Sequence, residues 1–217
     1  MLNGYKTYNC KILKVERETS DSLTFTLTSP YQGFTFICGQ YVMVSIPGFG
    51  EGAISISSDM NAKKIFQLTV RKVGVLTTAM HKLKKGDIIG IRGPYGRSFP
   101  IDSSKGKNIL IVVGGCGIPP IRPLILDAIK NPQKYKKIYV FYGSKSEDTL
   151  FFKREYEQWQ KVCDLYIALE NPKTKKYHQG LVTALFDLKD IPFDAIAFVC
   201  GPPIMYKFCL LYTSDAA

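Results

Sequence analysis

The sequence predicts two successive domains: an N-terminal antiparallel β-barrel and a C-terminal α/β domain with a doubly wound parallel sheet. Three observations support this fold class. Residues 1–103 contain short segments rich in β-branched and aromatic residues, separated by Gly, Pro, Asp or Asn. After the polar stretch Asp102–Gly106, strand-like and helix-like segments alternate, as they do in parallel sheets covered by helices on both faces. The first of these strands, Ile109–Val113, is continuously apolar, which is typical of a strand buried on both faces.

The first domain, residues 1–103, is expected to contain a series of strands and one helix. The strands are predicted at Tyr8–Val15, Ser22–Thr28, Gln40–Ile46, Ala53–Ser57, Ile65–Arg71 and Ile88–Arg92. The helix is predicted at Val75–Lys84, because its apolar residues recur at the spacing of one helical face. Short strands at such close spacing favour an antiparallel barrel.

The second domain, residues 104–210, is expected to alternate between strands and helices. Its strands are predicted at Ile109–Val113, Lys137–Tyr142, Leu165–Leu169 and Ala195–Cys200, and its helices at Pro119–Lys130, Asp148–Lys161, Leu181–Leu188 and Pro203–Leu210. A nucleotide-binding sheet normally continues beyond such a last helix. We therefore interpret the sequence as a truncated reading frame in which residues 211–217 form a non-native tail.

Composition narrows the class of protein. The chain has 29 Lys and Arg against 18 Asp and Glu, a formal net charge of +11, but the lysines are scattered and no nucleic-acid-binding motif accompanies them. A basic surface of this kind can steer anionic cofactors or an acidic partner. No apolar run is long enough for a membrane span and no secretion signal is present, so we expect a cytoplasmic protein. The six cysteines form no C-x-x-C pair and have no metal-site spacing. Since no secretion signal is present, a disulfide framework is not expected either.

The strongest local signal is the turn that follows the apolar strand. It reads Gly114-Gly115-Cys116-Gly117-Ile118-Pro119-Pro120 and leads into a helix. Glycines allow a pyrophosphate to approach the backbone, and the helix N-terminus supplies free N–H groups and a favourable dipole. The motif lacks the usual third glycine, so an ordinary tight turn is the alternative when it is taken alone.

The next strand ends in Tyr142-Gly143-Ser144-Lys145-Ser146. Dinucleotide-binding folds often carry an acidic residue here for the ribose hydroxyls. Ser144 and Lys145 instead favour a 2′-phosphate and hence NADP, whereas the nearby Glu147 and Asp148 argue the other way. The choice between NADP and NAD stays open, and a solvated turn is the alternative.

A third turn, Cys200-Gly201-Pro202-Pro203, closes the last predicted strand and opens a helix. Such a turn at the carboxyl edge of a parallel sheet faces the ligand crevice. A thiol there can pack against a nicotinamide ring and position it for hydride transfer. An isolated cysteine would be interpreted as structural, but beside two other parts of a nucleotide site we favour the functional role.

The barrel carries a possible second pyrophosphate site. Gly74-Val75-Leu76-Thr77 joins a strand to the single helix, so that helix amides and a hydroxyl become available, and Arg71 can add charge. The segment Ala53–Ser58 alternates apolar and hydroxyl residues. A helix cap and an ordinary barrel strand are the alternatives. No metal-ligand spacing and no catalytic acid–base set is found elsewhere.

In combination and in this order, these motifs resemble the ferredoxin–NADP⁺ reductase superfamily. Within it, the chain is most similar to the gamma subunits of cytoplasmic NAD(P)-linked hydrogenases (sulfhydrogenases). The segments that carry the resemblance are Pro47-Gly48-Phe49-Gly50-Glu51, Ile54-Ser55-Ile56-Ser57-Ser58, Arg71-Lys72-Val73-Gly74, Gly90-Ile91-Arg92-Gly93-Pro94-Tyr95-Gly96, Tyr142-Gly143-Ser144-Lys145-Ser146 and Cys200-Gly201-Pro202-Pro203-Ile204-Met205-Tyr206. The corresponding subunit of anaerobic sulfite reductase and the dihydroorotate dehydrogenase electron-transfer subunit are alternatives. A non-catalytic nucleotide-binding module is an alternative of a different class.

The resemblance implies that FAD binds to the barrel and NAD(P) to the α/β domain. The implied FAD-binding residues are Ile54, Ser55, Ile56, Ser57, Arg71, Gly74, Leu76 and Thr77. The implied NAD(P)-binding residues are Gly114, Gly115, Gly117, Ile118, Pro119, Gly143, Ser144, Lys145, Gly201, Pro202 and Pro203, with Cys200 as the catalytic residue. Hydride would pass from nicotinamide to flavin, and electrons would then leave singly.

Two departures from the family pattern matter. Many relatives have Arg-x-Tyr-Ser at the flavin strand, whereas this chain reads Gly52-Ala53-Ile54-Ser55, without the phosphate-binding arginine or the stacking tyrosine. Relatives also end in a cysteine cluster that holds [2Fe-2S], which we expect in a missing C-terminal segment. The implied partners are the iron–sulfur and catalytic subunits of a hydrogenase or sulfite reductase complex, with no nucleic acid and no membrane span.

Overall fold

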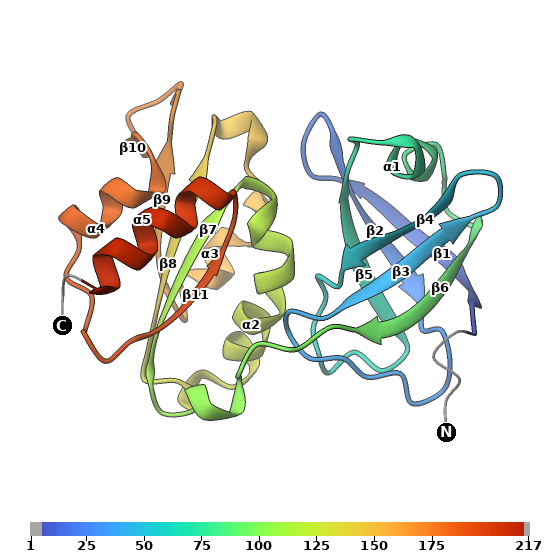
Figure 1. The fold of residues 1–217 in the computed structure, drawn as a ribbon, viewed down its shortest axis with the longest axis horizontal. Helices are drawn as coiled ribbons and strands as arrows, with labels where there is room; N and C mark the ends of the chain where they lie inside the picture. The colour runs from blue at the N-terminus through green and yellow to red at the C-terminus, as the bar shows by residue number, and fades with distance from the viewer. Residues whose placement is uncertain (1–5, 215–217) are drawn as a thin grey trace. The chain divides into compact units, whose positions relative to one another are not determined.

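The structure is a computed structural model that describes residues 6–214, with side chains described for residues 6–209. Its contacts divide the chain into two compact units, with the division between Phe99 and Pro100 (Figure 1). Residues 215–217, the end of the segment expected to be a non-native tail, lie outside the described residues.

The first unit is built around a six-stranded sheet in the order β4-β3-β6-β1-β2-β5. Its strands are β1 (Tyr8–Arg17), β2 (Ser22–Thr28), β3 (Tyr41–Ile46), β4 (Gly50–Ser55), β5 (Ile65–Arg71) and β6 (Ile88–Tyr95). All neighbouring pairs are antiparallel. An antiparallel bridge between Ile56, just beyond β4, and Leu68 of β5 joins the two edge strands. The predicted antiparallel barrel is therefore confirmed.

Helix α1 (Val75–Met80) is shorter than the predicted helix Val75–Lys84. The backbone N–H groups of Lys82 and Leu83 donate to Ala79 and Met80, three residues back, so the chain tightens and leaves the α-helix. The apolar spacing was a sound guide to the buried face, because Ala79 and Met80 are buried. It could not fix where the helix ends.

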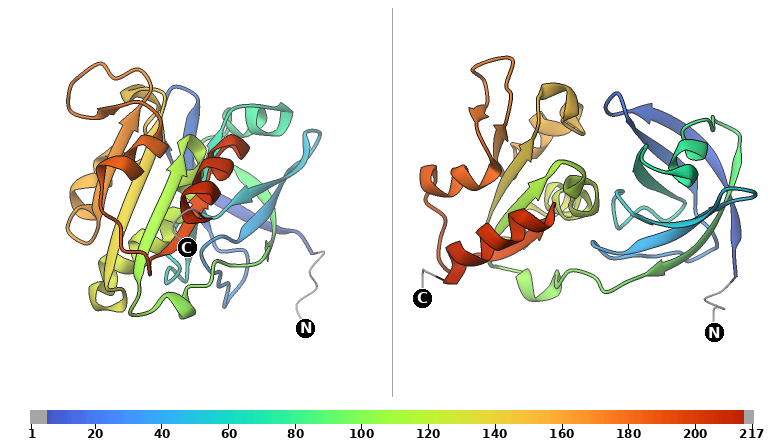
Figure 2. Two further views of the ribbon diagram at one scale, coloured as in Figure 1. Left: turned by 60° about the vertical axis from the view of Figure 1, so that its left-hand side comes forward. Right: turned by 45° about the horizontal axis from the view of Figure 1, so that its top comes forward.

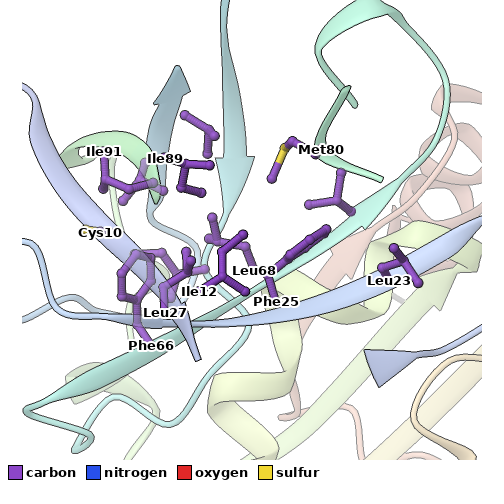
Figure 3. Packing of buried hydrophobic residues seen from close by; sticks show 14 of the residues in the cluster. Cys10, Ile12, Leu23, Phe25, Leu27, Phe66, Leu68, Met80, Ile89 and Ile91 are labelled. Atoms are coloured by element: carbon purple, nitrogen blue, oxygen red, sulfur yellow. The ribbon is translucent and has the colours of Figure 1, made fainter. Parts of the chain in front are cut away.

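The barrel core consists of alternate residues of the strands. Cys10 and Ile12 on β1, Phe25 and Leu27 on β2, and Phe66 and Leu68 on β5 are fully buried, and Met80 enters from α1 (Figure 3). A chain of hydroxyls is buried as well: Thr69 Oγ1 lies 3.0 Å from Thr24 Oγ1 and 2.9 Å from Ser57 Oγ. These mutual hydrogen bonds offset the cost of burying the hydroxyls.

The second unit contains a five-stranded parallel sheet in the order β10-β9-β8-β7-β11. Its strands are β7 (Asn108–Gly114), β8 (Lys137–Ser144), β9 (Asp164–Leu169), β10 (His178–Gln179) and β11 (Ile196–Cys200). The chain builds the sheet outward from β7 through β8 and β9, then returns to place β11 on the other side of β7. The order of strands therefore reverses at β7, and ligands bind outside the carboxyl ends of the strands at such a switch point.

Helices cover both faces of this sheet (Figure 2). The α-helices are α2 (Ile118–Lys130), α3 (Tyr156–Trp159), α4 (Leu185–Leu188) and α5 (Pro203–Ser214). Leu110 and Val112 of β7 pack in one cluster with Leu185 of α4 and Met205 of α5. Because side chains alternate along a strand, the fully buried Ile109, Ile111 and Val113 face the opposite side, where α2 contacts β7. The predicted doubly wound α/β fold is confirmed.

The predicted continuous helix Asp148–Lys161 is wrong. The segment forms two 3₁₀ turns, Glu147–Thr149 and Lys153–Glu155, followed by the short α3. Leu150, Phe151 and Phe152 are all buried, and a single helix cannot bury three consecutive side chains on one face. Phe152 takes the left-handed conformation, with φ of 55°, and thereby reverses the chain.

The predicted helix Leu181–Leu188 is also shorter than expected. A 3₁₀ turn at Val182–Ala184 precedes α4. The two-residue strand β10 was not predicted. The polar pair His178-Gln179 carries no alternation from which a strand could be recognised.

A partly buried ion pair joins α2 to the 3₁₀ turn Lys153–Glu155, which lies where a continuous helix was predicted. Arg122 donates from Nε to Glu155 Oε2 and from Nη2 to Glu155 Oε1, both at 2.8 Å. The guanidinium carbon lies 4.6 Å from the centroid of the Phe152 ring. Only 9% of the Arg122 side chain and 17% of the Glu155 side chain are exposed. The pair therefore fixes the orientation of α2.

Glu155→Ala should lower the free energy of unfolding of the second unit by about 3–5 kcal/mol, because it leaves the Arg122 guanidinium buried without its partner. Denaturant titration followed by circular dichroism measures this loss. Asp102→Ala is the matched control, because it removes the exposed ion pair of Asp102 with Lys105. Equal destabilisation by the two substitutions would contradict the role given to the buried pair.

Candidate functional site

The three sequence signals of the second unit meet at the carboxyl edge of its sheet. In the parallel registers, Cys200 of β11 lies beside Val113 of β7, and Gly114 of β7 lies beside Gly143 of β8. The turns that follow β11, β7 and β8 are therefore neighbours in space. The structure brings together residues that are far apart in sequence, at the switch point where a dinucleotide is expected.

Glycines allow the turns after β7 and β11 to touch. A Cβ atom on Gly117 would lie 1.9 Å from the carbonyl oxygen of Cys200. A Cβ atom on Gly114 would lie 3.0 Å from Cδ of Pro202, and one on Gly201 would lie 3.1 Å from the backbone nitrogen of Gly114. The contact at Gly117 is with backbone, so no side-chain movement could relieve it. We call this contact between Gly114–Gly117 and Cys200–Pro202 the turn–turn contact.

The start of α2 is open to an anionic ligand. Gly115 has a φ of +50°, and a Cβ there would meet no atom within 4 Å. Gly117 is the N-cap, and Ile118 and Pro119 begin the helix as buried residues. Pro119 and Pro120 have no N–H, and the amide of Ile118 donates to the Gly115 carbonyl. The helix start therefore offers an anion the dipole of this 13-residue helix rather than the free first-turn amides that were expected from the sequence. These features fit the pyrophosphate of a dinucleotide.

Cys200 is a half-buried thiol beside this turn. Burial raises the pKa of the Cys200 thiol above its ordinary value, so at neutral pH the group is an uncharged S–H. A neutral, polarisable sulfur can pack against a flat ring. Burial is the cause of the raised pKa of Cys200, and no nearby cation lowers this pKa. The surroundings therefore do not activate Cys200 as a thiolate nucleophile.

The end of β8 contributes the third part of this edge. Gly143 approaches the turn before α4, since a Cβ there would lie 2.7 Å from Cβ of Val182. The Ser144 hydroxyl is engaged locally, 2.8 Å from Thr149 Oγ1. Lys145 is exposed. Of the two residues expected at a 2′-phosphate, the lysine is the exposed one, and its ammonium forms no ion pair among the residues that the structure describes.

In the barrel, the start of α1 is a capped turn. Thr77 Oγ1 accepts hydrogen bonds from the amides of Val73 and Gly74, at 3.0 and 2.9 Å. The amides of Val75 and Leu76 belong to the first helical turn and have no intrahelical acceptor. A Cβ on Gly74 would meet no atom within 4 Å, so the backbone is open there.

Arg71 lies at the end of β5, before this turn. Its Nε donates to Asp21 Oδ2 at 2.8 Å. Burial alone would raise the pKa of Asp21, but hydrogen bonds from Thr19, Ser22 and Arg71 outweigh it and lower the pKa. The ion pair holds the guanidinium at the edge of the barrel.

The residues from Ile54 to Ser57, which the family resemblance implies at the flavin, differ in what their side chains contact. Ile56 is buried in the barrel core, so it can offer only its backbone to a ligand, whereas Ile54 packs against the core and remains partly exposed. Ser57 is committed to the buried hydroxyl chain with Thr69. Ser55 is half-buried and is the residue of this group with a hydroxyl outside that chain.

Two further residues bear on the flavin site. Ser58 is 4% exposed, and its hydroxyl has no hydrogen-bond partner. A buried hydroxyl without a partner is costly, which points to a missing ligand or water. Its signal was the run Ser57-Ser58, but sequence could not separate a bonded serine from an unbonded one. A Cβ on Gly52 would lie 2.8 Å from Cδ2 of Leu76, so the Leu76 side chain packs closely against the backbone at this position.

The residues present fit both cofactors. The orphaned Ser58 hydroxyl, the open backbone at Gly74 and the first turn of α1 suit a flavin and its pyrophosphate. The open Gly115 and the start of α2 suit a second dinucleotide. Within residues 6–214 no cluster of His, Cys, Asp and Glu side chains is arranged to hold a metal ion. No helix in the same range has the length and apolar character of a membrane span.

A barrel with a flavin-type site, followed by a doubly wound domain with a dinucleotide-type site, defines a flavin oxidoreductase that uses a pyridine nucleotide. Comparison with known families agrees with this class. Residues 9–99 match the oxidoreductase FAD-binding domain, and residues 111–210 match the oxidoreductase NAD-binding domain.

Individual proteins narrow the class further. The chain is 38% identical to the sulfhydrogenase 2 subunit gamma of Pyrococcus furiosus, over 96% of this chain and 79% of that protein. It is 33% identical to the sulfhydrogenase 1 subunit gamma of the same organism, over 94% of this chain and 74% of that protein. A probable dihydroorotate dehydrogenase B (NAD(+)) electron transfer subunit of Thermococcus kodakarensis is 32% identical, over 82% and 69% of the respective chains.

Solved structures share the fold. A ferredoxin NADP⁺ reductase from Neisseria gonorrhoeae, solved with bound FAD and NADP, matches with a TM-score of 0.81 at 20% identity, over 97% of this chain and 91% of that chain. The cytochrome b5 reductase domain of Ulva prolifera nitrate reductase matches with a TM-score of 0.79 at 18% identity, over 99% and 94% of the respective chains.

The chain belongs to the ferredoxin reductase family of FAD- and NAD-binding oxidoreductases. It is an FAD-containing electron-transfer subunit and a flavin oxidoreductase that works with NAD(P).

Gly117→Ala should abolish reduction of the flavin by NAD(P)H while the protein still retains FAD. The added methyl group would overlap the Cys200 carbonyl, so the turn–turn contact must open. Anaerobic flavin reduction, followed by visible absorption, measures the loss. Lys130→Ala, at the exposed far end of the same helix, is the control. Normal reduction of the Gly117→Ala protein would show that the nucleotide does not depend on this contact.

Proposed function

We propose that this chain carries electrons between NAD(P)H and a hydrogenase of the sulfhydrogenase type, as its gamma subunit. The observation that supports this most strongly is the identity of 38% to a sulfhydrogenase gamma subunit over 96% of the chain. A second such subunit, at 33% identity, points the same way. In this proposal the partners are the iron–sulfur and catalytic subunits of that hydrogenase.

Each domain has its own part in the proposed reaction. When bound, FAD and NAD(P) supply the hydride and electron chemistry. The backbone of Ile54 and Ile56, the Ser55 hydroxyl and the first turn of α1 hold the flavin, with Arg71 and Asp21 setting the charge beside it. In the second unit, the Gly114–Gly117 turn holds the pyrophosphate of NAD(P).

Cys200 acts in this proposal as the residue that contacts the nicotinamide. Its thiol is half-buried and neutral, and its backbone is fixed by the turn–turn contact. It moves no proton, because hydride transfer between two ring systems needs no acid or base from the protein. Its contribution is therefore the position of the ring, set by sulfur packing and by the rigid Cys200–Pro203 turn.

The proposal extends to an iron–sulfur acceptor. A flavin that accepts a hydride and serves a metal-containing partner needs a one-electron acceptor between them. We propose a [2Fe-2S] cluster on the intact gene product in this role, following the family resemblance. The described residues supply no ligand set for it. In the same proposal the protein lies in the cytoplasm, where a reducing environment keeps the six cysteines in the thiol form.

The second candidate function is electron transfer as a subunit of a dihydroorotate dehydrogenase. A probable electron transfer subunit of that enzyme from Thermococcus kodakarensis is 32% identical over 82% of this chain. The flavin chemistry would be the same, and only the partner would differ.

Anaerobic isolation of the tagged full-length gene product from its own cells tests the partner. The proposal predicts co-isolation with hydrogenase subunits, iron–sulfur absorption, and reduction of NAD(P) by hydrogen gas. Untagged cells are the control for non-specific recovery. Isolation with a dihydroorotate-oxidising subunit, and no activity with hydrogen, would contradict the hydrogenase role in favour of the second candidate.

Cys200→Ala should slow flavin reduction by NAD(P)H by about 10-fold to 100-fold, because misplacing a reacting group by about 1 Å costs about 100-fold. The dissociation constant of FAD should stay unchanged. Stopped-flow absorption and FAD titration measure the two quantities. Lys130→Ala, at the exposed far end of α2, is the control. Stopped-flow rates equal to those of the unaltered protein would contradict the role of Cys200.

A further inference from the structure

Two thiols lie on the two sides of the turn–turn contact. Cys116 belongs to the glycine turn after β7, and Cys200 is the last residue of β11. The residue next to Cys116 is Gly117, whose backbone lies against the Cys200 carbonyl. Both cysteines are present as thiols. Two sulfur atoms from distant parts of the sequence therefore belong to neighbouring turns at the carboxyl edge of the second sheet.

These two thiols differ in their access to solvent. Cys116 is exposed, whereas Cys200 is half-buried, and burial raises the pKa of the Cys200 thiol. The other four cysteines of the chain are buried: Cys10, Cys38, Cys163 and Cys209. Burial raises the pKa of Cys10 and of Cys163 to about 12, so these two thiols carry almost no thiolate at neutral pH. A thiol reagent that arrives from solvent therefore meets Cys116 first.

The turn that carries Cys116 has the freedom to bring this thiol to Cys200. A disulfide needs α-carbons within about 7 Å of each other and Cβ atoms directed toward one another. The contact of Gly117 with the Cys200 carbonyl keeps the two backbones close. Glycine flanks Cys116 on both sides, and a Cβ on Gly115 would meet no atom within 4 Å. A local change in the glycine turn is therefore enough to direct one thiol at the other.

We propose that Cys116 is a modification site for small disulfides (R–S–S–R), and that Cys200 is the thiol that resolves the adduct. The Cys116 thiolate attacks one sulfur of the reagent, the S–S bond of the reagent breaks, and the first R–S⁻ leaves. Cys200 then loses its proton to solvent and attacks the Cys116 sulfur, which expels the second R–S⁻. Overall, two cysteine thiols are oxidised to one disulfide, and R–S–S–R is reduced to two R–SH.

The second step is intramolecular, and this offsets the small thiolate fraction of Cys200. Groups that one structure holds together react at effective concentrations far above those of a reagent in solution. The product ties the glycine turn to the residue that we place at the nicotinamide. Its effect on activity rests on the proposed function, because the disulfide withdraws the Cys200 sulfur from the nicotinamide. The exchange of thiols itself needs no nucleotide and does not rest on that function.

Thiol stoichiometry tests the exchange directly. The purified, FAD-reconstituted chain is treated with dithiobis-nitrobenzoate, an aromatic disulfide whose released thiolate absorbs visible light, and its intact mass is then recorded. The proposal predicts two equivalents of thiolate per chain, a mass lowered by two hydrogens and no retained label. Release of one equivalent with the label retained would overturn the proposal, as would no release. One equivalent together with a disulfide-linked dimer of chains would overturn it as well.

Three variants assign the two steps to their residues. Cys116→Ser should react at least about tenfold more slowly, because the exposed thiol is gone. Cys200→Ser should release one equivalent and keep the label on Cys116, which peptide mapping locates. Cys209→Ser alters a buried cysteine of α5 and is the matched control, with the behaviour of the unaltered protein. Fast release from Cys116→Ser, or two equivalents from Cys200→Ser, would overturn the role given to that residue.

Anaerobic flavin reduction then shows whether the modification closes the nucleotide site, with each protein compared with its own untreated sample. Treatment should slow reduction of the unaltered protein by NAD(P)H by about 100-fold, because a reacting group is displaced, and dithiothreitol should restore the rate. The rate of Cys116→Ser should not respond to treatment. Complete exchange with an unchanged rate would overturn the predicted closure. Complete exchange in a protein whose untreated flavin no nucleotide reduces would support the thiol pair while contradicting the proposed electron transfer.

Discussion

The contact between the Gly117 backbone and the Cys200 carbonyl is the constraint on which the nucleotide site of the second unit depends. It exists because position 117 has no side chain, and a Cβ there would lie 1.9 Å from that oxygen. The contact fixes two turns that come from opposite ends of the domain sequence. Through it, the helix start that suits a pyrophosphate and the thiol that suits a nicotinamide are held in one arrangement. Replacing Gly117 with a residue that has a Cβ would therefore separate the start of α2 from the Cys200 thiol.

The barrel buries several hydroxyl groups in its wall, and buried hydroxyls need hydrogen-bond partners. Ser57, Thr24 and Thr69 satisfy one another inside the wall, whereas the Ser58 hydroxyl is buried without a partner. The family's arginine position is Gly52, and the side chain of Leu76 packs closely against the backbone there. In the proposed flavin site the ligand would therefore meet mainly backbone and hydroxyl groups, with helix α1 contributing packing as well as amides. This accounts for a flavin-binding domain that lacks the arginine and the tyrosine.

Sequence was a good guide wherever one local rule decided the outcome. The continuously apolar Ile109–Val113 predicted the central buried strand, and the glycine turn after it predicted the helix that follows. Sequence failed where tertiary contacts overrode the local pattern. The segment Asp148–Lys161 has helical composition, but three consecutive buried residues force it to turn at Phe152. The hydrogen bond from the amide of Lys173 to the Glu147 carboxylate could not be foreseen either, because Lys173 lies in a loop that only the folding of β9 brings beside β8.

The most direct test of the electron-transfer assignment is the visible absorption spectrum of the purified, FAD-reconstituted chain, recorded without oxygen before and after NADPH and then NADH are added. The account predicts flavin bands that bleach when a pyridine nucleotide is supplied. A protein that remains colourless after reconstitution, with a circular dichroism spectrum of a folded α/β protein, would contradict the flavin site. Flavin bands that persist with both nucleotides would contradict electron transfer from NAD(P)H.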